Sequence, residues 1–465
     1  MSNVTLVRGL GRLAATAIVV GDVIGTGVFL KARVMTCNVG TPGLVMLVWV
    51  VGGLLSLAGA LTYAELAVLM PQAGGEYVFI REAYGRLWGF LYGWTRFFVA
   101  TTGGLAGLAF GFAIFLNIVS GGTLQSLSVD LPLVGGRHVT MFALPFVAAA
   151  AIAVVTLVNC AAVVVGGRIA SVLAALKVTI VAGVGIGAFV LARGDWAHFT
   201  MTAAGRACAG VPLGARGGFA GFGAAMLGAM WAYNGWNEVT YVAGEVKDPG
   251  RNLPFAIIGG IGIIASLYLF ANVAYFYVLP PAAVAGVPVS SSVATEVVAS
   301  FLGPRAGGFM AAALAMCVFG SLQIVSLVSA RIPYAMAEDG LFFKSLARLS
   351  PRTRVPIRAL LAQAAWAIVL VFSGSYDTIT DYAIFAVLIF VALATASVFL
   401  FRRRMPDAPR PYRTLGYPVV PILFLLVASW LVINTLLTTP DRALAGVGLM
   451  LLGLPCYWYW SRKPA

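Results

Sequence analysis

The sequence is poor in charged residues, and this scarcity is its first informative property. Asp, Glu, Lys and Arg make up 10% of the 465 residues, whereas soluble globular proteins carry about 25%. Apolar residues make up 61%, and the mean hydropathy is +0.96. This composition excludes an ordinary soluble domain and indicates an integral membrane protein.

Residues that commonly build catalytic or metal centres are also scarce. The two histidines, His138 and His198, fall in predicted loops, and the five cysteines stand singly without a CxxC pair. These absences argue against a metal centre, a histidine-based catalytic centre and a disulfide framework. We therefore expect no metal, no cofactor and no enzymatic activity. Cys37 and Cys208 both fall on the predicted outer side and could pair, but the sequence leaves this open.

Long apolar runs are abundant, and together they predict an all-α membrane protein with twelve transmembrane helices. Each crossing needs about 20 mostly apolar residues. The first run is long and lacks an Ala-x-Ala site, so we expect no cleavable signal peptide. The predicted spans are 13–35, 42–70, 86–119, 140–160, 164–193, 219–244, 254–279, 306–337, 357–374, 378–401, 416–437 and 441–461.

The formal net charge of +14 would suit a nucleic-acid partner, but the placement of the basic residues argues against one. Twenty of the 30 Lys and Arg residues fall on the N-terminal side of the predicted topology, and eight fall on the other side. This bias follows the positive-inside rule, so we expect both termini in the cytoplasm and the chain in the inner or plasma membrane. We interpret the arginine run 402–404 as an anchor beside anionic lipid.

Two glycine interruptions inside apolar helices carry the main functional signal. They are Gly25-Thr26-Gly27 in the first span and Ala232-Tyr233-Asn234-Gly235 in the sixth. Lipid-facing irregular backbone leaves polar groups unsatisfied, so such breaks survive only inside the protein or around a cavity. Gly21 and Gly25 alone could serve helix packing. Two breaks in matching spans favour a solute site instead, because half-helix ends offer amides to an anion and carbonyls to an ammonium.

The positions of the two breaks also predict an internal symmetry. The broken spans are the first members of two sets of five, and an odd number of spans places the two sets in opposite orientation. We therefore predict one membrane domain with a 5+5 inverted repeat. Its parts are a cytoplasmic N-tail (1–12), a transport core (13–401, with halves 13–193 and 219–401), and a final part (402–465) with a basic loop, two spans and a short C-tail.

Ionisable residues within predicted spans are functional candidates by default, because burying them in a bilayer is costly. Lys177 lies in the fifth span and Asp22 in the first, and we hypothesise that they form an ion pair and take part in ion or proton coupling. For Arg96 we favour snorkelling to the interface over pairing with an acid.

Four acidic residues lie near the predicted inner side of the membrane. Glu238 and Glu245 follow the second break on one helix face, where gate contacts and simple solvation are both open. We expect Glu65 and Glu76 to support loop structure.

Five ordered motifs resemble the amino acid-polyamine-organocation superfamily, and two of them resemble its L-type amino acid transporter branch. The likeness extends over nearly the whole chain and implies a leucine-transporter-like fold that moves amino acids by alternating access. The motifs lie at 24–29, 65–85, 233–254, 331–341 and 409–418.

The resemblance also implies roles for residues at the two breaks. Backbone amides of Gly25, Thr26 and Gly27 would bind the substrate carboxylate, and carbonyls of Ile24, Trp231 and Ala232 would bind its amine. In proton-linked relatives an ammonium in the fifth span replaces a sodium ion, and Lys177 matches that position. The residues expected to form the gate and the side-chain pocket are Trp231, Tyr233, Asn234 and Asn237.

Competing functions differ in what they require of the sequence. A channel would need a repeated filter, and a membrane enzyme would need clustered catalytic residues; neither pattern is present. We expect a secondary transporter of neutral L-amino acids, either an exchanger or a proton-linked carrier without sodium. A carrier of cationic amino acids or polyamines is the alternative. Animal relatives attach a heavy chain through a cysteine between spans three and four; residues 120–139 contain none, so we expect no obligate heavy chain.

Overall fold

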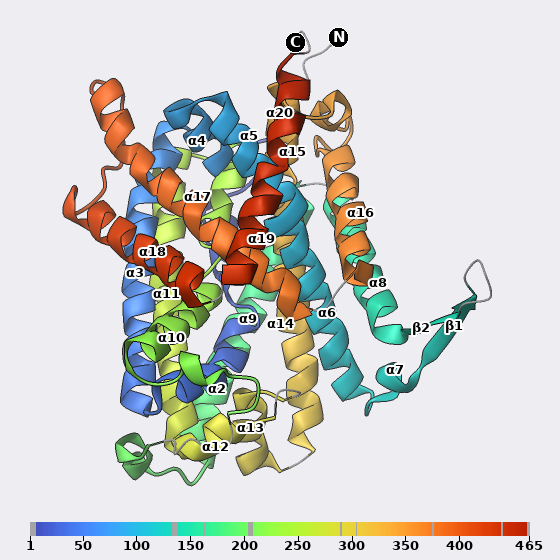
Figure 1. Ribbon diagram of the computed structural model, residues 1–465, viewed down its shortest axis with the longest axis vertical. Coiled ribbons are helices and arrows are strands. Elements are labelled where there is room, and N and C mark those ends of the chain that lie inside the picture. Colours follow the sequence, from blue (N-terminus) through green and yellow to red (C-terminus); the bar gives the residue numbers. More distant parts are fainter. Residues whose placement is uncertain are drawn as a thin grey trace.

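The computed structural model describes residues 6–132, 138–161, 163–202, 208–288, 291–303, 305–373, 376–438 and 440–462. Long helices dominate it, and α4, α5 and α15 lie at the opposite end of the molecule from α12 and α13 (Figure 1). The α-helices are α1 (Arg12–Val23), α2 (Gly27–Val39), α3 (Pro42–Leu69), α4 (Glu76–Tyr84), α5 (Arg86–Thr95), α6 (Thr101–Val119), α7 (Thr123–Ser126), α8 (Ala143–Ala161), α9 (Val163–Leu191), α10 (Gly218–Ala232), α11 (Pro249–Val278), α12 (Pro281–Gly286), α13 (Val293–Leu302), α14 (Ala306–Ser329), α15 (Arg331–Glu338), α16 (Ile357–Ser373), α17 (Tyr376–Arg404), α18 (Val419–Thr438), α19 (Pro440–Leu451) and α20 (Gly453–Ser461). The remaining elements are a π-helix, η1 (Arg96–Ala100), the 3-10 helices η2 (Trp196–Thr200), η3 (Leu213–Ala215), η4 (Glu238–Glu245) and η5 (Lys344–Ala347), and the strands β1 (Ser128–Pro132) and β2 (His138–Phe142).

Eight helical segments of the described chain are long and apolar enough to cross a membrane. They correspond to eight of the twelve predicted spans, so the chain is a helical membrane protein. The predicted spans 219–244 and 357–374 coincide with shorter apolar helices, α10 and α16. The last predicted span, 441–461, is divided between α19 and α20. Twelve crossings and the inverted repeat remain predictions.

Local sequence signals explain several helix boundaries. The α2 helix ends at Gly40, which has a φ of 79° that glycine adopts without strain. The next helix, α3, starts with Pro42 after Thr41, whose hydroxyl accepts a hydrogen bond from the Leu44 amide at 3.3 Å.

One hairpin departs from the predicted all-α fold. Strands β1 and β2 pair antiparallel, with Ser128 opposite Phe142. Residues 140–142, which we expected to begin the fourth span, therefore belong to β2, and α8 starts at Ala143. The β-branched residues Val139 and Thr140 favour this extended conformation.

A disulfide joins Cys37, near the end of α2, to Cys208, in the segment before η3. The sequence left this pairing open. The bond connects the second half of the first broken helix to the polypeptide that leads into the second broken helix. The Arg33 guanidinium supports the same junction, because it donates to the Ala209 carbonyl at 3.0 and 3.1 Å.

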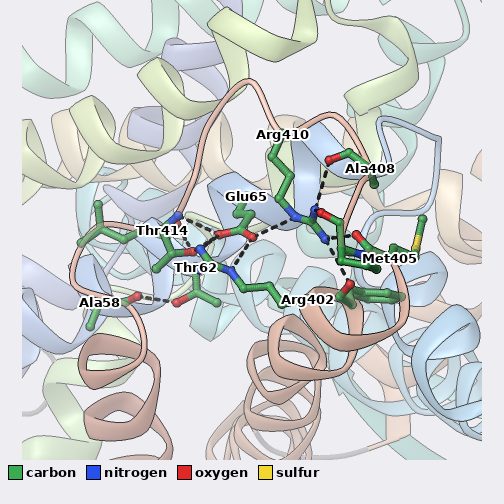
Figure 2. Close-up of polar contacts among 11 residues, drawn as sticks. Ala58, Thr62, Glu65, Arg402, Met405, Ala408, Arg410 and Thr414 are labelled. Carbon is green, nitrogen blue, oxygen red and sulfur yellow. Dashed lines mark hydrogen bonds and ion pairs between the residues drawn. The ribbon is translucent and has the colours of Figure 1, made fainter.

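Figure 2 shows Glu65, near the end of α3, beside Arg402 at the end of α17 and groups from the segment between α17 and α18. Its carboxylate accepts from Arg402 at 2.7 and 3.0 Å and from the Thr414 amide and hydroxyl at 2.7 Å. The Arg410 guanidinium lies 3.3 Å away. The expected role of Glu65 in loop structure is consistent with these contacts. Arg402 was interpreted as a lipid anchor, but it binds the protein's own α3.

The same end of the molecule contains a fully buried ion pair. Arg331 of α15 donates to both carboxylate oxygens of Glu245 at 2.7 and 3.0 Å, and neither side chain is exposed. Simple solvation of Glu245 is therefore excluded. Leu10 lies beside this pair, because its amide donates to the Glu245 carbonyl at 3.0 Å and its carbonyl accepts from the Lys247 amide at 2.8 Å. The N-terminal segment is thereby joined to the end of the second broken helix.

We expect Arg331→Met to lower the free energy of unfolding by about 3–5 kcal/mol, because it leaves the Glu245 carboxylate buried without its partner. Thermal and denaturant unfolding in detergent micelles would measure this loss. The double variant Arg331→Met, Glu245→Met should regain most of it, since an apolar pair replaces the ion pair. The exposed Arg403→Met variant is the control. A single variant as stable as the unmodified protein would contradict the prediction.

Candidate functional site

The first interruption separates α1 from α2. The Gly25 amide donates to the Val23 carbonyl at 2.8 Å, so the chain turns sharply after α1 instead of continuing the helix. Carbonyls freed by this turn find a partner on α14, where the Ser321 hydroxyl lies 3.3 Å from the carbonyl oxygens of Asp22 and Ile24. These carbonyl groups at the break therefore have hydrogen-bond partners inside the protein, as a helix interruption in a membrane requires.

The second interruption separates α10 from η4. Gly235 has a φ of 113°, a conformation that favours glycine, and its carbonyl accepts from the Glu238 amide at 3.0 Å. The Tyr268 hydroxyl of α11 lies 2.8 Å from the Val23 carbonyl and 3.0 Å from the Ala232 carbonyl. One side chain therefore contacts the broken ends of both helices.

The two broken helices also touch directly. A Cβ added at Gly27 would lie 2.5 Å from both the Cα and the Cβ of Ala232. No side chain larger than hydrogen fits there without moving backbone. Gly27 therefore sets how closely the start of α2 approaches the end of α10.

A cavity of about 110 Å³ lies beside the two interruptions. In this measure roughly 10–15 Å³ holds one water molecule, so the cavity has room for a small organic solute. It is lined by Asp22, Val23, Gly25, Thr26, Gly27, Arg96, Ala100, Thr101, Gly104, Leu108, Met230, Trp231, Asn234, Trp236, Asn237, Glu238, Ser321, Val325, Val387, Leu388, Val391 and Phe424.

Most of the site residues predicted from the sequence line this cavity. The amide-bearing residues Gly25, Thr26 and Gly27 do so, as do three of the expected gate and pocket residues, Trp231, Asn234 and Asn237. The structure therefore brings the two interruptions to one site, although more than 200 residues separate them in the sequence.

Three predicted residues lie behind the cavity wall. Ile24 and Ala232 are buried, and their carbonyls already contact Ser321 and Tyr268. Tyr233, which we expected in the side-chain pocket, points toward α3, where its hydroxyl donates to the Trp49 carbonyl at 3.1 Å. Its ring packs against Trp49 at a centroid distance of 5.8 Å. The turn after Ala232 rotates Tyr233 away from the cavity, which spacing alone did not reveal.

Lys177 of α9 contacts the first interruption but is not among the residues that line the cavity. Its ammonium donates to the Gly21 carbonyl, and to the Ser321 hydroxyl at 2.6 Å. The expected ion pair with Asp22 is wrong, since the described residues contain no contact within 4 Å between the two charged groups. Lys177 instead places a positive charge against the carbonyls at the end of α1.

Arg96 lines the cavity, and the prediction that it snorkels to the membrane interface was wrong. Instead of snorkelling, it is buried on the π-helix η1 and donates to the Glu238 carboxylate at 2.7 Å and to the Tyr241 hydroxyl. A π-helix inside a longer helix often marks a functional position. Solvation of Glu238 is excluded as well, because the side chain is 7% exposed.

Glu76 is a second residue whose role the sequence did not reveal. We expected it to support a loop, but its buried carboxylate lies behind the cavity, where the Asn237 amide donates to it at 3.0 Å. Tyrosine hydroxyls complete the shell: Tyr92 donates at 2.6 Å, Tyr241 at 2.9 Å, and Tyr63 also contacts it. Tyrosines cluster in no recognisable sequence motif, so only the fold identifies this network.

A small cavity between two interrupted helices of a membrane protein is characteristic of solute carriers. The comparisons identify the family more closely. Residues 10–454 match the family described as amino acid permease, and the chain belongs to that family.

Individual relatives match along almost the entire chain. The serine/threonine exchanger SteT of Bacillus subtilis (strain 168) is 29% identical, over 99% of this chain and 98% of the relative. The large neutral amino acids transporter small subunit 2 of Homo sapiens is 30% identical, over 99% of this chain and 82% of the relative. The b(0,+)-type amino acid transporter 1 of Homo sapiens is 28% identical, over 99% and 90%.

We expect Gly27→Ala to lower the thermal unfolding midpoint and weaken amino acid binding, because the added methyl group forces α2 and α10 apart. Overpacking of this kind costs about 1–3 kcal/mol. Thermal unfolding with and without added amino acid measures both effects. Gly183→Ala is the matched control, because an added Cβ there meets nothing within 4 Å. Equal behaviour of the two variants would show that the close approach at Gly27 is unimportant.

Proposed function

We propose that this permease is a secondary transporter of neutral L-amino acids that works by alternating access, as an exchanger or a proton-linked carrier without sodium. The observation that carries the proposal is the cavity between two paired helix interruptions. Backbone groups at such interruptions match the features that all amino acids share, and the surrounding side chains provide selectivity.

The carboxylate of the substrate would bind at the start of α2. The first amides of a helix have no intrahelical partner and lie at its positive end, so they attract an anion. Thr26 and Gly27 are the best candidates, because the Gly25 amide already donates to the Val23 carbonyl.

The ammonium group of the substrate would face carbonyls at the ends of α1 and α10. The carbonyls of Ile24, Trp231 and Ala232 remain the proposed acceptors, because a carbonyl oxygen can accept two hydrogen bonds. Trp231 and Asn234 would contact the substrate side chain, since both line the cavity and are only partly buried. Asn237 would act through its bond to Glu76.

Names of the relatives support this substrate class. One is a serine/threonine exchanger and another a transporter of large neutral amino acids. A carrier of cationic amino acids or polyamines is the second candidate, because Asp22 and Glu238 place two acids on the cavity wall. The ion pair between Glu238 and Arg96 weighs against it, since it leaves less negative charge for a cationic side chain.

The membrane arrangement is also part of the proposal. We infer twelve spans in one domain, a 5+5 inverted repeat, both termini in the cytoplasm of a cell-membrane protein, and no obligate heavy chain. The disulfide between Cys37 and Cys208 lies on the predicted outer side. Disulfides persist in oxidising compartments outside the cytoplasm, which supports this orientation.

Counterflow in liposomes tests the substrate. With unlabelled amino acid inside, external labelled serine or leucine should accumulate transiently, and excess unlabelled alanine should compete. Saturating substrate should also raise the stability of the purified protein, by about 2.7 kcal/mol at 100 times the dissociation constant. Uptake of labelled arginine or putrescine with no response to serine or leucine would favour the second candidate. Flux that never saturates would indicate a channel.

Lys177→Met tests the proposal that the lysine charge replaces a sodium ion beside α1. The variant removes a buried ammonium that contacts the Gly21 carbonyl and Ser321, so we expect substrate counterflow to fall at least tenfold, which corresponds to about 1.4 kcal/mol. Thr179→Val, two residues along α9 and exposed, is the control. A Lys177→Met protein with the full rate of counterflow would refute this role.

A further inference from the structure

Two acidic side chains meet at the cavity, one from each broken helix. Asp22 lies in the last turn of α1, and Glu238 is the first residue of η4. As whole residues they are 8% and 5% exposed, and both line the cavity. Two ionised carboxylates buried at one cavity repel each other, whereas a protonated carboxyl group can donate a hydrogen bond to an ionised one.

Unsatisfied oxygen atoms lead to the same conclusion. Asp22 Oδ2 and Glu238 Oε2 are both buried, and neither has a hydrogen-bond partner in the described part of the chain. A buried polar atom without a partner is costly. A proton on one carboxyl group would allow it to donate a hydrogen bond to the other, which would give a partner to an oxygen atom of each group.

The surroundings assign this proton to Asp22. Glu238 accepts a charged hydrogen bond from Arg96 at 2.7 Å, which stabilises its ionised form. No Lys or Arg nitrogen of the described residues lies within 4 Å of the Asp22 carboxyl group. Asp22 also lies at the negative end of the α1 dipole, which disfavours a second negative charge. A buried, unpaired carboxylate in this position is neutralised most easily by a proton.

Three other charged groups face the acid pair. Arg96 approaches from η1, Lys177 from α9, and Glu76 from the start of α4. The two positive groups have their own closest partners, which are Glu238 for Arg96 and the Gly21 carbonyl and Ser321 for Lys177. Neither therefore replaces the proton on Asp22.

The proton site depends on both broken helices being together. A Cβ added at Gly235 would lie 2.7 Å from Asp22 Oδ2, so the carboxyl group rests directly against the second interruption. Separation of α1 from η4 would remove the Glu238 acceptor and admit water to Asp22. Water stabilises the ionised carboxylate, so the proton would leave at that stage.

We propose that Asp22, with Glu238 as its hydrogen-bond acceptor, is a proton-binding site that couples amino acid movement to a proton. The proton stays on Asp22 while the two interruptions are in contact, and passes to water in the cavity when they separate. This inference rests on the proposed transport function and selects the proton-linked form of it.

Purified protein in liposomes tests the inference. Labelled serine or leucine uptake is measured with equal pH on both sides and with an acidic exterior, while a pH-sensitive dye trapped inside reports proton entry. A gradient of about one pH unit can drive up to roughly tenfold accumulation of a solute that moves with one proton. We expect such accumulation, with acidification of the interior during uptake and no requirement for sodium.

Variants of the pair separate coupling from transport itself. In Asp22→Asn the amide cannot release a proton, so the ratio of gradient-driven to gradient-free uptake should fall toward one. Glu238→Gln should lower the same ratio, because the ionised acceptor is lost. Asp407→Asn is the matched control, since Asp407 is exposed in the segment after α17, and its ratio should stay at the level of the unmodified protein.

The unmodified protein alone can overturn the inference if the variants do not fold. Counterflow without acidification or gradient-driven accumulation would refute the proton site but leave the transport function intact. Absence of counterflow for every amino acid tested would refute the transport function itself. Sodium-driven uptake, or exchange of lysine or putrescine without proton movement, would mean that the acid pair binds a different cation.

Discussion

The structure depends on satisfying backbone polar groups where two buried helices are interrupted. A helix break in an apolar environment frees amides and carbonyls that lipid cannot bind. Here the surrounding helices provide the partners. Tyr268 contacts carbonyls of both breaks, Ser321 contacts those at the end of α1, and Lys177 adds a positive charge beside them. Groups that remain without intrahelical partners lie at the cavity, where a polar solute can bind them.

The charged groups near the cavity follow the same constraint. Arg96 balances Glu238, and tyrosine hydroxyls with Asn237 surround Glu76. Partners of this kind are required because an isolated buried charge is costly. Asp22 is the exception, since no Lys or Arg nitrogen of the described residues lies within 4 Å of its carboxyl group and its Oδ2 atom has no hydrogen-bond partner there. This exception distinguishes a group that can change its protonation state from groups that hold the structure together.

A second set of polar contacts lies away from the cavity, at the end predicted to face the cytoplasm. Arg331 and Glu245 form a fully buried pair, Leu10 binds the backbone next to it, and Glu65 joins α3 to the segment before α18. These contacts connect the N-terminal segment, the end of the second broken helix and α15. Alternating access would require some of them to break, so their strength would help to set the balance between conformations.

The sequence alone determined the class of fold, the approximate ends of most long helices and the two interruptions. These features depend on hydropathy and on glycine positions, which can be read from short stretches of chain. It could not determine which side chains face the cavity. Tyr233 was predicted to line the cavity, but the turn after Ala232 directs its side chain toward α3. Lys177 was predicted to pair with Asp22, but it binds the Gly21 carbonyl and Ser321. The contacts of Arg96 and Glu76 were also missed. These depend on groups more than 100 residues apart in some cases, as between Arg96 and Glu238. Only the packing of helices in three dimensions brings such groups together, and it alone decides which buried charge receives a partner.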